Sequence, residues 1–365
     1  MDTKDFSDKF IAAFMEDVKE LGVEPATKNP RVIDYMDEII AFVKDLVDKG
    51  FAYEANGDVY FRVAKSKNYA KLANKTLEDL EVGASGRVDG EGNIKENPLD
   101  FALWKAAKLG EVSWKSPWGQ GRPGWHIECS VMATSILGDT IDIHGGGADL
   151  EFPHHTNEIA QSEAKTGKTF ANYWMHNGFV NVDNEKMSKS LGNFVTVHDM
   201  LKTVDGQVLR FFLATQQYRK PINFTEKAVH DASVNLKYLK NTFTLPLGKA
   251  VDAAELAKFK ADFEAAMDDD FNTANGITVA FDMAKWINSG NYDQVTKDTF
   301  AKMLAVFGIV FEEEVLDADI EALIEKRQEA RANRDFATAD AIRDQLAAQG
   351  IKLLDTKDGV RWTCD

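Results

Sequence analysis

Cysteine is almost absent from this chain, with two among 365 residues. Two thiols cannot form a disulfide framework, so the composition is typical of a reducing compartment and predicts a cytoplasmic protein. The sequence also has no apolar run of the length needed to span a bilayer, and its start, MDTKDFSDKF, is too acidic for a signal peptide. We therefore expect no membrane partner.

Basic residues are also fewer than acidic ones. The chain carries 43 Lys and Arg against 59 Asp and Glu, a net charge of −16. This balance argues against nucleic-acid binding by bulk electrostatics, so any such partner would need local basic patches. The hydrophobic fraction of 44% and the charged fraction of 28% are ordinary for a globular protein, and the length suggests two or three domains.

The first fifty residues have the apolar spacing of two amphipathic helices. Phe6, Phe10 and Phe14 recur at helical intervals in the first. Asn29 is a plausible cap for the second, with Pro30 as its first helical residue. The following stretch FAYEANGDVYFRV has an Asn-Gly pair between two aromatic and β-branched runs, which predicts a hairpin.

From Pro123 onward the pattern alternates between helix and strand. GWHIECSVMATSIL predicts a helix, DTIDIH a short strand, GGGADL a glycine loop, and FPHHTNEIAQSEAKTG a helix with Pro153 in its first turn and Gly167 at its end. This order suits a parallel α/β sheet with a ligand at the carboxyl ends of its strands. After about residue 200 the chain is expected to be helical, ending in a small charged helical tail.

One candidate metal set combines Cys129 with the PHHTNE segment. His154 and Glu158 are four residues apart, so on a helix they share one face and can converge on one ion. Together with the Cys129 thiolate they form a mixed set of N, O and S donors that suits Zn²⁺. The alternatives remain open, because such a His–Glu pair is also an ordinary helix contact and a free Cys is also a small core hydrophobe.

Two loops have the composition of nucleotide-binding segments. In IHGGGADL, bare glycines allow a backbone to approach a ligand, and Asp149 could accept a hydrogen bond from a ribose hydroxyl. In NEKMSKSLGN, Lys186 and Lys189 could hold a polyphosphate and neutralise charge as pyrophosphate leaves. Glycines required only by a turn, and a solvated Lys/Ser loop, are the structural alternatives.

Several long motifs resemble one family. KMSKS is the second signature of class I aminoacyl-tRNA synthetases, and the surrounding motifs resemble cysteinyl-tRNA synthetases from near residue 1 to the C-terminus. The motifs that carry this resemblance are PGWHIECS, DIHGGGADLEFPHHTNEIAQSEA, YWMHNGFV, EKMSKSLGNF, NPLDFALWKAAK, AAMDDDFNTANG and ARANRDFATADAIRDQLAAQGIKLLDT.

The resemblance implies an α/β fold: the C-terminal half of a class I synthetase Rossmann-type domain, with an α+β insertion before it and an all-α helical bundle after it. The implied domains are a connective and insertion region over 1–122, and the second half of the nucleotide-binding catalytic domain with the KMSKS loop over 123–195. A stem-contact and helical-bundle tRNA-binding domain over 196–318 and a small anticodon-side subdomain over 319–365 follow.

The resemblance also implies roles for individual residues. Zinc would be held by Cys129, His154 and Glu158, which stand at the positions of the family's second zinc Cys, its His and its Glu; in this family the site also uses a first Cys, and zinc binds the substrate thiolate. Trp125 and His144 would lie near the amino-acid pocket. The remaining implied roles are ribose binding by Gly147 and Asp149, and catalysis on the ATP phosphates by Lys186 and Lys189.

The implied activity is cysteine–tRNA ligation. L-Cysteine and ATP, with Mg²⁺, would form cysteinyl-adenylate, and the cysteinyl group would pass to tRNA(Cys); a monomer is expected. The chain departs from the family pattern because none of its seven histidines stands in an HxGH-type motif and the first zinc cysteine is missing. We therefore expect a shortened chain with weak zinc retention and weak or no activity alone.

Three alternatives to cysteine–tRNA ligation remain open. A non-catalytic tRNA-binding module, or a split or degenerate paralogue, could use Arg327, Arg331, Arg334 and Arg343 of the tail as local positive charge. A ligase joining activated cysteine to a sugar amine shares the catalytic motifs but lacks such a tail. A zinc hydrolase is the weakest alternative, because nothing around His154 and Glu158 resembles a water-activating arrangement.

Overall fold

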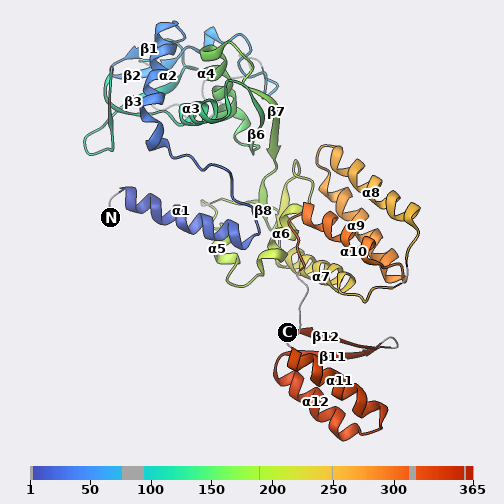
Figure 1. Cartoon of the computed structure of the whole chain (residues 1–365). Helices are drawn as coiled ribbons and strands as arrows, with labels where there is room; N and C mark the ends of the chain where they lie inside the picture. The colour runs from blue at the N-terminus through green and yellow to red at the C-terminus, as the bar shows by residue number, and fades with distance from the viewer. Residues whose placement is uncertain are drawn as a thin grey trace. The chain divides into compact units, whose positions relative to one another are not determined.

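The computed structural model describes residues 3–75, 94–188, 190–248, 250–311, 318–356 and 359–364. The chain forms two compact units, Met1–Val310 and Phe311–Asp365 (Figure 1), and each is described by itself. Among the described residues, none of the helices combines the length and the apolar character that crossing a membrane requires.

The first predicted helix is present, and the second begins later than expected. Helix α1 spans Thr3–Glu20, and Phe6, Phe10 and Phe14 on it are 54%, 55% and 60% exposed. Pro30 is not helical; a short turn over Val32–Tyr35 leads into α2, Met36–Asp48. Arg31 is the extended N-cap of this turn, so the helical backbone cannot start at Pro30, and its guanidinium donates to Asp8 of α1 at 2.7 Å.

The hairpin prediction is confirmed. Strands β1, Ala52–Ala55, and β2, Asp58–Phe61, pair antiparallel across Asn56 and Gly57, whose φ angles of 57° and 84° both lie in the left-handed region that an Asn-Gly turn favours. They belong to a five-stranded antiparallel sheet of order β1-β2-β3-β5-β4. The other strands are β3, Phe101–Ala106, β4, Trp114–Ser116, and β5, Gly119–Pro123.

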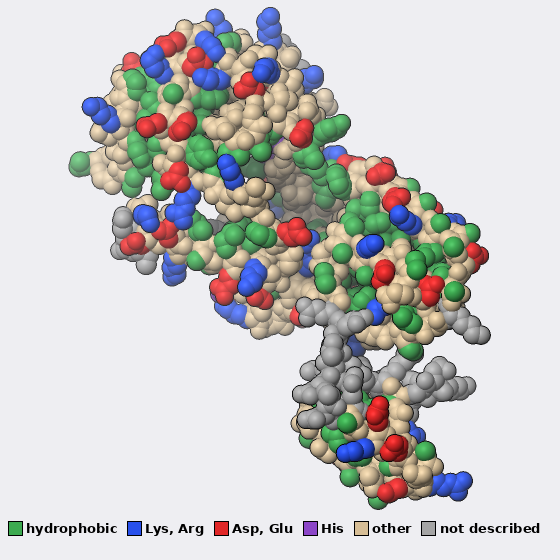
Figure 2. Space-filling model, in the orientation of Figure 1, with side chains coloured by type: hydrophobic (Ala, Val, Ile, Leu, Met, Phe, Trp, Pro, Cys, Tyr) green, Lys and Arg blue, Asp and Glu red, His purple; other side chains and the backbone are tan. Residues whose placement is uncertain are grey.

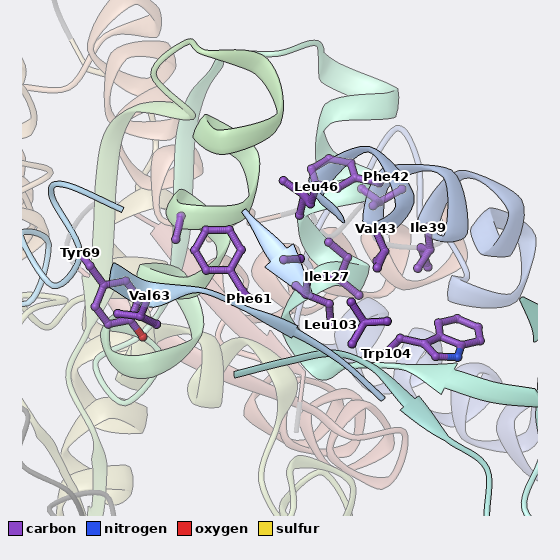
Figure 3. Packing of buried hydrophobic residues seen from close by; sticks show 14 of the residues in the cluster. Ile39, Phe42, Val43, Leu46, Phe61, Val63, Tyr69, Leu103, Trp104 and Ile127 are labelled. Carbon is purple, nitrogen blue, oxygen red and sulfur yellow. The ribbon is translucent and has the colours of Figure 1, made fainter. Parts of the chain in front are cut away.

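Helices α2, α3 (Trp125–Leu137) and α4 (Thr156–Thr166) pack with this sheet around one hydrophobic core. Figure 3 shows Ile127 of α3 among side chains from α2 and the sheet. The core therefore extends across the predicted boundary between residues 122 and 123, while the domain limits themselves stay a prediction. Its labelled members are Ile39, Phe42, Val43, Leu46, Phe61, Val63, Tyr69, Leu103, Trp104 and Ile127.

The predicted parallel strand pair lies beside these helices (Figure 1). Strand β6, Ile141–Gly147, pairs with β7, Ala171–Asn177, and α4 connects them. One detail differs from expectation: β6 continues through the three glycines. Phe152 is extended, with φ −139° and ψ 131°, and the helical backbone after this kink runs through the π-helical segment Glu151–His155 directly into α4, so Pro153 lies in the first turn, as predicted. Gly167 ends α4 in the left-handed region, as predicted.

A small sheet and a helical bundle complete the first unit. Strand β8, Val180–Val182, pairs antiparallel with β9, Glu185–Lys186, and parallel with β10, Ile222–Phe224. The chain beyond residue 200 is therefore not wholly helical, because the apolar Ile222–Phe224 segment pairs with β8. The helices are α5 (Val197–Met200), α6 (Gly206–Ala214), α7 (Glu226–Phe243), α8 (Ala253–Asp268), α9 (Thr273–Asn288) and α10 (Gln294–Val306).

Over its described residues the second unit contains two helices and a hairpin, so the expected helical tail is helical only in part. Helices α11, Ala318–Ala332, and α12, Phe336–Ala348, are followed by β11, Ile351–Thr356, and β12, Gly359–Cys364, which pair antiparallel. A small apolar cluster holds the helices and β11 together, and its buried members are Ile324, Ile342, Leu346 and Ile351.

Candidate metal centre

Five of the seven histidines gather where α3, β6, β7 and the turn before α4 meet. Their rings contact one another directly: His126 Nδ1 lies 2.9 Å from His154 Nδ1, and His155 Nδ1 lies 2.8 Å from His176 Nε2. The members are His126 on α3, His144 on β6, His154 and His155 in the turn Glu151–His155, and His176 on β7. We call this group the histidine cluster.

The structure brings the three predicted zinc ligands together. One ligand atom is offered by each of Cys129 on α3, His154 in the turn before α4, and Glu158 on α4. These atoms all lie within 4.8 Å of one another. His154 is 4% exposed and Glu158 is fully buried. Nε2 of His154 lies 3.7 Å from Oε1 of Glu158. We call these three residues the first donor set.

One oxygen of Glu158 supports the metal interpretation. Its Oε1 is buried and finds no hydrogen-bond partner among the described residues, which is costly for a carboxylate out of water. A cation at the first donor set would pair this oxygen. The set combines a sulfur, an imidazole nitrogen and a carboxylate oxygen, which are the ligand types of Zn²⁺, so the residues fit a zinc ion. The assignment of these ligands stays a prediction.

Burial governs the protonation of the site. It lowers the pKa of His154 below its usual range despite the neighbouring Glu158, and it lowers the pKa of His155 to about 3. Both imidazoles are therefore neutral and can act as metal ligands. Burial, followed by the charges of Glu158 and Glu128, raises the pKa of the Cys129 thiol to about 12, so a cation that binds there must displace a proton.

Sequence reasoning missed His126, His155, His176 and Trp174. A signal for part of the group was available in YWMHNG, because residues two apart on a strand share a face. Trp174 pairs with His144 across the two strands, and its ring centroid lies 4.9 Å from that of His144 and 5.3 Å from that of His155. The strand register therefore places these rings together.

The two residues predicted for the amino-acid pocket border the cluster. Trp125 is 52% exposed, and its ring centroid lies 4.6 Å from that of His154. Nε2 of His144 lies 2.9 Å from Oε2 of Glu158. One residue thus offers an accessible aromatic face beside the first donor set, and the other contacts a member of it. Their role in substrate binding stays a prediction.

The glycines at the end of β6 allow close packing of polar side chains. A Cβ on Gly146 would lie 2.9 Å from Cε1 of His155, and a Cβ on Gly147 would lie 2.5 Å from Oδ1 of Asp149. Gly147 and Asp149 are at the carboxyl end of β6, where the α/β arrangement was expected to bind a ligand. A ribose contact there stays a prediction.

The predicted phosphate-binding lysines lie in another part of the unit. Lys186 is on β9, and its Nζ lies 4.1 Å from the ring centroid of Phe179. Lys189 lies outside the described residues. The geometry therefore places Lys186 in the sheet formed by β8, β9 and β10, and the action of both lysines on ATP stays a prediction.

Comparison with protein families covers most of the chain. Residues 1–234 match the family of class I tRNA synthetase (C) catalytic domains, residues 262–312 match the DALR domain, and residues 313–362 match the cysteinyl-tRNA ligase anticodon-binding domain. Methionyl-tRNA synthetase of Mycobacterium tuberculosis, solved with methionyl-adenylate, shares the fold, with a TM-score of 0.53 at 13% identity over 81% of this chain and 74% of that chain. The fold and domain order define a class I synthetase.

Relatives narrow the class to one family. The chain is 84% identical to a cysteine–tRNA ligase of Streptococcus agalactiae over 100% of this chain and 82% of the relative. It is 82% identical to a cysteine–tRNA ligase of Streptococcus thermophilus, over 100% of this chain and 81% of the relative. The chain belongs to the cysteine–tRNA ligase family.

Proposed function

We propose that this chain activates L-cysteine with ATP to form cysteinyl-adenylate and transfers the cysteinyl group to tRNA(Cys). The observation that carries this proposal is the convergence of Cys129, His154 and Glu158 within 4.8 Å beside the exposed ring of Trp125. Family membership and the high identity to cysteine–tRNA ligases support the same activity. The reaction requires tRNA, cysteine and ATP, and we propose that it takes place in the cytoplasm; we also propose that the protein is a monomer.

We further propose that Cys129, His154 and Glu158 hold zinc. When bound, zinc would supply direct coordination of the substrate thiolate, which separates cysteine from serine by chemistry instead of shape. Shape alone discriminates poorly because the two substrates differ by one atom. The chain's own contribution is to hold three donors in a buried pocket whose imidazoles are neutral.

Trp125 and His144 are proposed to form the pocket for the rest of the amino acid. The indole of Trp125 is half exposed and lies against His154, so it can cover the apolar part of a bound cysteine. His144 contacts Glu158 at 2.9 Å and thereby holds one oxygen of that carboxylate in place. Together they would orient the substrate carboxylate for in-line attack on the α-phosphate.

We propose that two segments of the chain bind ATP with Mg²⁺. Gly147 and Asp149 at the end of β6 would accept the ribose, and Lys186 and Lys189 would neutralise the phosphates as pyrophosphate leaves. Lys186 is exposed, which leaves its ammonium group accessible to a polyphosphate. No protein nucleophile is required, because positioning and charge stabilisation carry the chemistry.

Interaction with tRNA is proposed for residues 262–362, on the basis of the two domain matches there. Individual arginines of the tail support the proposed tRNA binding less well. Arg343, for example, pairs with Asp340 at 3.0 Å and with Asp344 at 3.2 Å. On the face drawn in Figure 2, basic and acidic side chains are interspersed over the described surface. The match to the anticodon-binding domain argues against the ligase that joins activated cysteine to a sugar amine, because that ligase lacks such a tail.

A substrate-binding experiment tests the proposal without relying on turnover. The chain is loaded with Co²⁺ in a Cys364→Ser background, and L-cysteine or L-serine is added. We expect cysteine to strengthen the thiolate-to-cobalt charge-transfer band and serine to leave it unchanged, with loss of the cysteine response in Cys129→Ser. Equal responses to both amino acids, or none to cysteine, would contradict the assigned specificity.

A second measurement separates the ligase from a tRNA-binding module. Cysteine-dependent ATP–pyrophosphate exchange is compared between the parent, Lys186→Met with Lys189→Met, and Lys227→Met as an exposed lysine control. We expect the double variant to lose exchange while cysteine still perturbs the cobalt spectrum. Salt-dependent tRNA binding by a parent that shows neither exchange nor any response of its cobalt spectrum to cysteine would instead favour the module.

A further inference from the structure

A second group of potential metal ligands lies next to the first. His144, His155 and Glu158 each offer one ligand atom, and these atoms also lie within 4.8 Å of one another. They come from β6, from the turn before α4 and from α4 itself. We call them the second donor set. Only Glu158 belongs to both sets.

The carboxylate of Glu158 uses a different oxygen in each set. Its Oε1 lies 3.7 Å from Nε2 of His154. Its Oε2 lies 2.9 Å from Nε2 of His144 and 3.9 Å from Nε2 of His155. A carboxylate arranged in this way can bridge two cations about 3.5–4 Å apart, as in enzymes with two metal ions.

His155 is held in an orientation that suits a ligand. Its Nδ1 lies 2.8 Å from Nε2 of His176, so one proton is shared between these two nitrogens. When Nδ1 of His155 carries that proton, its Nε2 presents a lone pair on the side of Glu158. A ligating histidine is typically oriented by a partner on its other nitrogen, and His176 occupies that position. Trp174 and the bare Gly146 enclose the ring.

We propose that His144, His155 and Glu158 form a second site for a divalent transition cation such as Zn²⁺ or Co²⁺. Two imidazoles and one carboxylate favour these borderline ions over Mg²⁺ and Ca²⁺, which prefer oxygen ligands. The site goes beyond the proposed function, since it uses neither Cys129 nor His154. Because it occupies His144 and Oε2 of Glu158, its filling inhibits a reaction that needs the same groups.

A Co²⁺ titration distinguishes the two sets. A cobalt ion at the first set has a thiolate ligand and gives a charge-transfer band, whereas a cobalt ion at the second set has N and O ligands and gives only weak d–d bands. The full chain is titrated in the Cys364→Ser background, which leaves Cys129 as its single thiol. We expect two equivalents per chain, of which one produces charge transfer.

Variants assign the second equivalent. His155→Gln is expected to remove it and to keep the charge-transfer band, whereas Cys129→Ser is expected to remove that band and to keep the second equivalent. His155 is only 2% exposed, so His176→Leu provides a milder test. Removing this orienting partner is expected to weaken the second equivalent by about 10- to 100-fold.

His198→Gln is the matched control, because His198 is exposed and contacts Asp17 on α1. We expect both equivalents to persist in this variant. The second site is overturned if the parent binds no cobalt beyond the equivalent that gives charge transfer. It is also overturned if His155→Gln and His176→Leu fold and retain the second equivalent. A parent that binds cobalt without any charge-transfer band would count against the first donor set alone, so the two proposals fail separately.

Discussion

Nε2 of His144 lies 2.9 Å from Oε2 of Glu158, while Oε1 of the same carboxylate is buried and has no hydrogen-bond partner in the part of the chain that the structure describes. The two oxygens of one fully buried group are therefore unequal. His144 satisfies one, and the other remains available beside Cys129 and His154. This inequality explains how Glu158 can act as a metal ligand while its orientation is fixed by a different residue.

Replacement of Glu158 by glutamine should separate metal binding from stability. Glu158→Gln keeps the shape and an oxygen for His144, but it removes the charge that a cation requires. We expect zinc affinity to fall by more than about 100-fold. Loss of a ligand should cost more than loss of a ligand's hydrogen-bond partner, which lowers affinity by about 10- to 100-fold. Without metal, the thermal midpoint should stay equal or rise, because glutamine keeps the oxygen that faces His144 and removes a buried carboxylate whose other oxygen finds no partner in the described part of the chain.

Chelator competition measures the affinity, and calorimetry without metal measures the midpoint. Asp142→Asn is the control, because Asp142 is an exposed carboxylate on β6 close to His144. We expect it to change neither quantity. Unchanged zinc affinity in Glu158→Gln would show that this carboxylate is not a ligand.

Replacement of Gly146 by alanine should disturb the histidine cluster. The new Cβ would lie 2.9 Å from Cε1 of His155 and 2.9 Å from Cδ1 of Leu150, so the imidazole must shift. We expect Co²⁺ binding without charge transfer to weaken by about 10- to 100-fold. Spectroscopic titration measures this change.

The neighbouring Gly145 provides the matched control. A Cβ there meets Met175 O at 3.5 Å, an ordinary contact. Gly145→Ala should therefore bind cobalt like the parent. Equal weakening in both variants would indicate a general disturbance of β6 instead of a specific displacement of His155.

Local chemistry allowed some of the fold to be predicted from the sequence. The Asn56–Gly57 turn was predictable because a two-residue loop with two positive φ angles requires these residue types. The start of α2 was not, because Arg31 after Pro30 is extended and its side chain contacts Asp8, which is 23 residues away. Capping preferences near Pro30 carry no information on such a contact.

The candidate site shows the same distinction. Cys129, His154 and Glu158 could be selected together because donor type, helical spacing and a family motif agreed. The contact between His155 and His176 could not be found in this way, because it depends on how β6, β7 and the turn before α4 pack. Strand register would have suggested Trp174 and His144 as neighbours, but the register itself depends on tertiary structure.

Replacement of Gly57 by alanine should destabilise the five-stranded sheet. Gly57 has φ 84°, and a Cβ there would approach Cβ of Ala106 at 3.3 Å. We expect a loss of about 1–2 kcal/mol, measured by urea unfolding followed through tryptophan fluorescence. Asn56→Gly keeps the turn accessible and should cost far less. A smaller effect for Gly57→Ala than for Asn56→Gly would argue against this turn.

Asp58 is predicted to stabilise the same sheet in a pH-dependent way. Burial opposes its ionisation, but hydrogen bonds from Lys105 Nζ at 2.7 Å, Ala106 N at 2.8 Å and Tyr60 Oη at 2.7 Å outweigh burial and lower the pKa of Asp58. A lowered folded pKa gives stability that is present above the unfolded value of about 4 and is lost as the pH falls through the folded value.

Asp58→Asn should therefore lower the free energy of unfolding by about 1–3 kcal/mol at neutral pH, and the difference from the parent should vanish in acid. The control is Asp139→Asn, because Asp139 accepts from Lys168 at the same 2.7 Å but is 48% exposed. We expect its cost to be about 0.5 kcal/mol or less. Urea unfolding at neutral and acid pH measures both variants. Equal costs would mean that distance, and not burial, sets the strength of these pairs, and a difference that persists in acid would remove Asp58 ionisation as its cause.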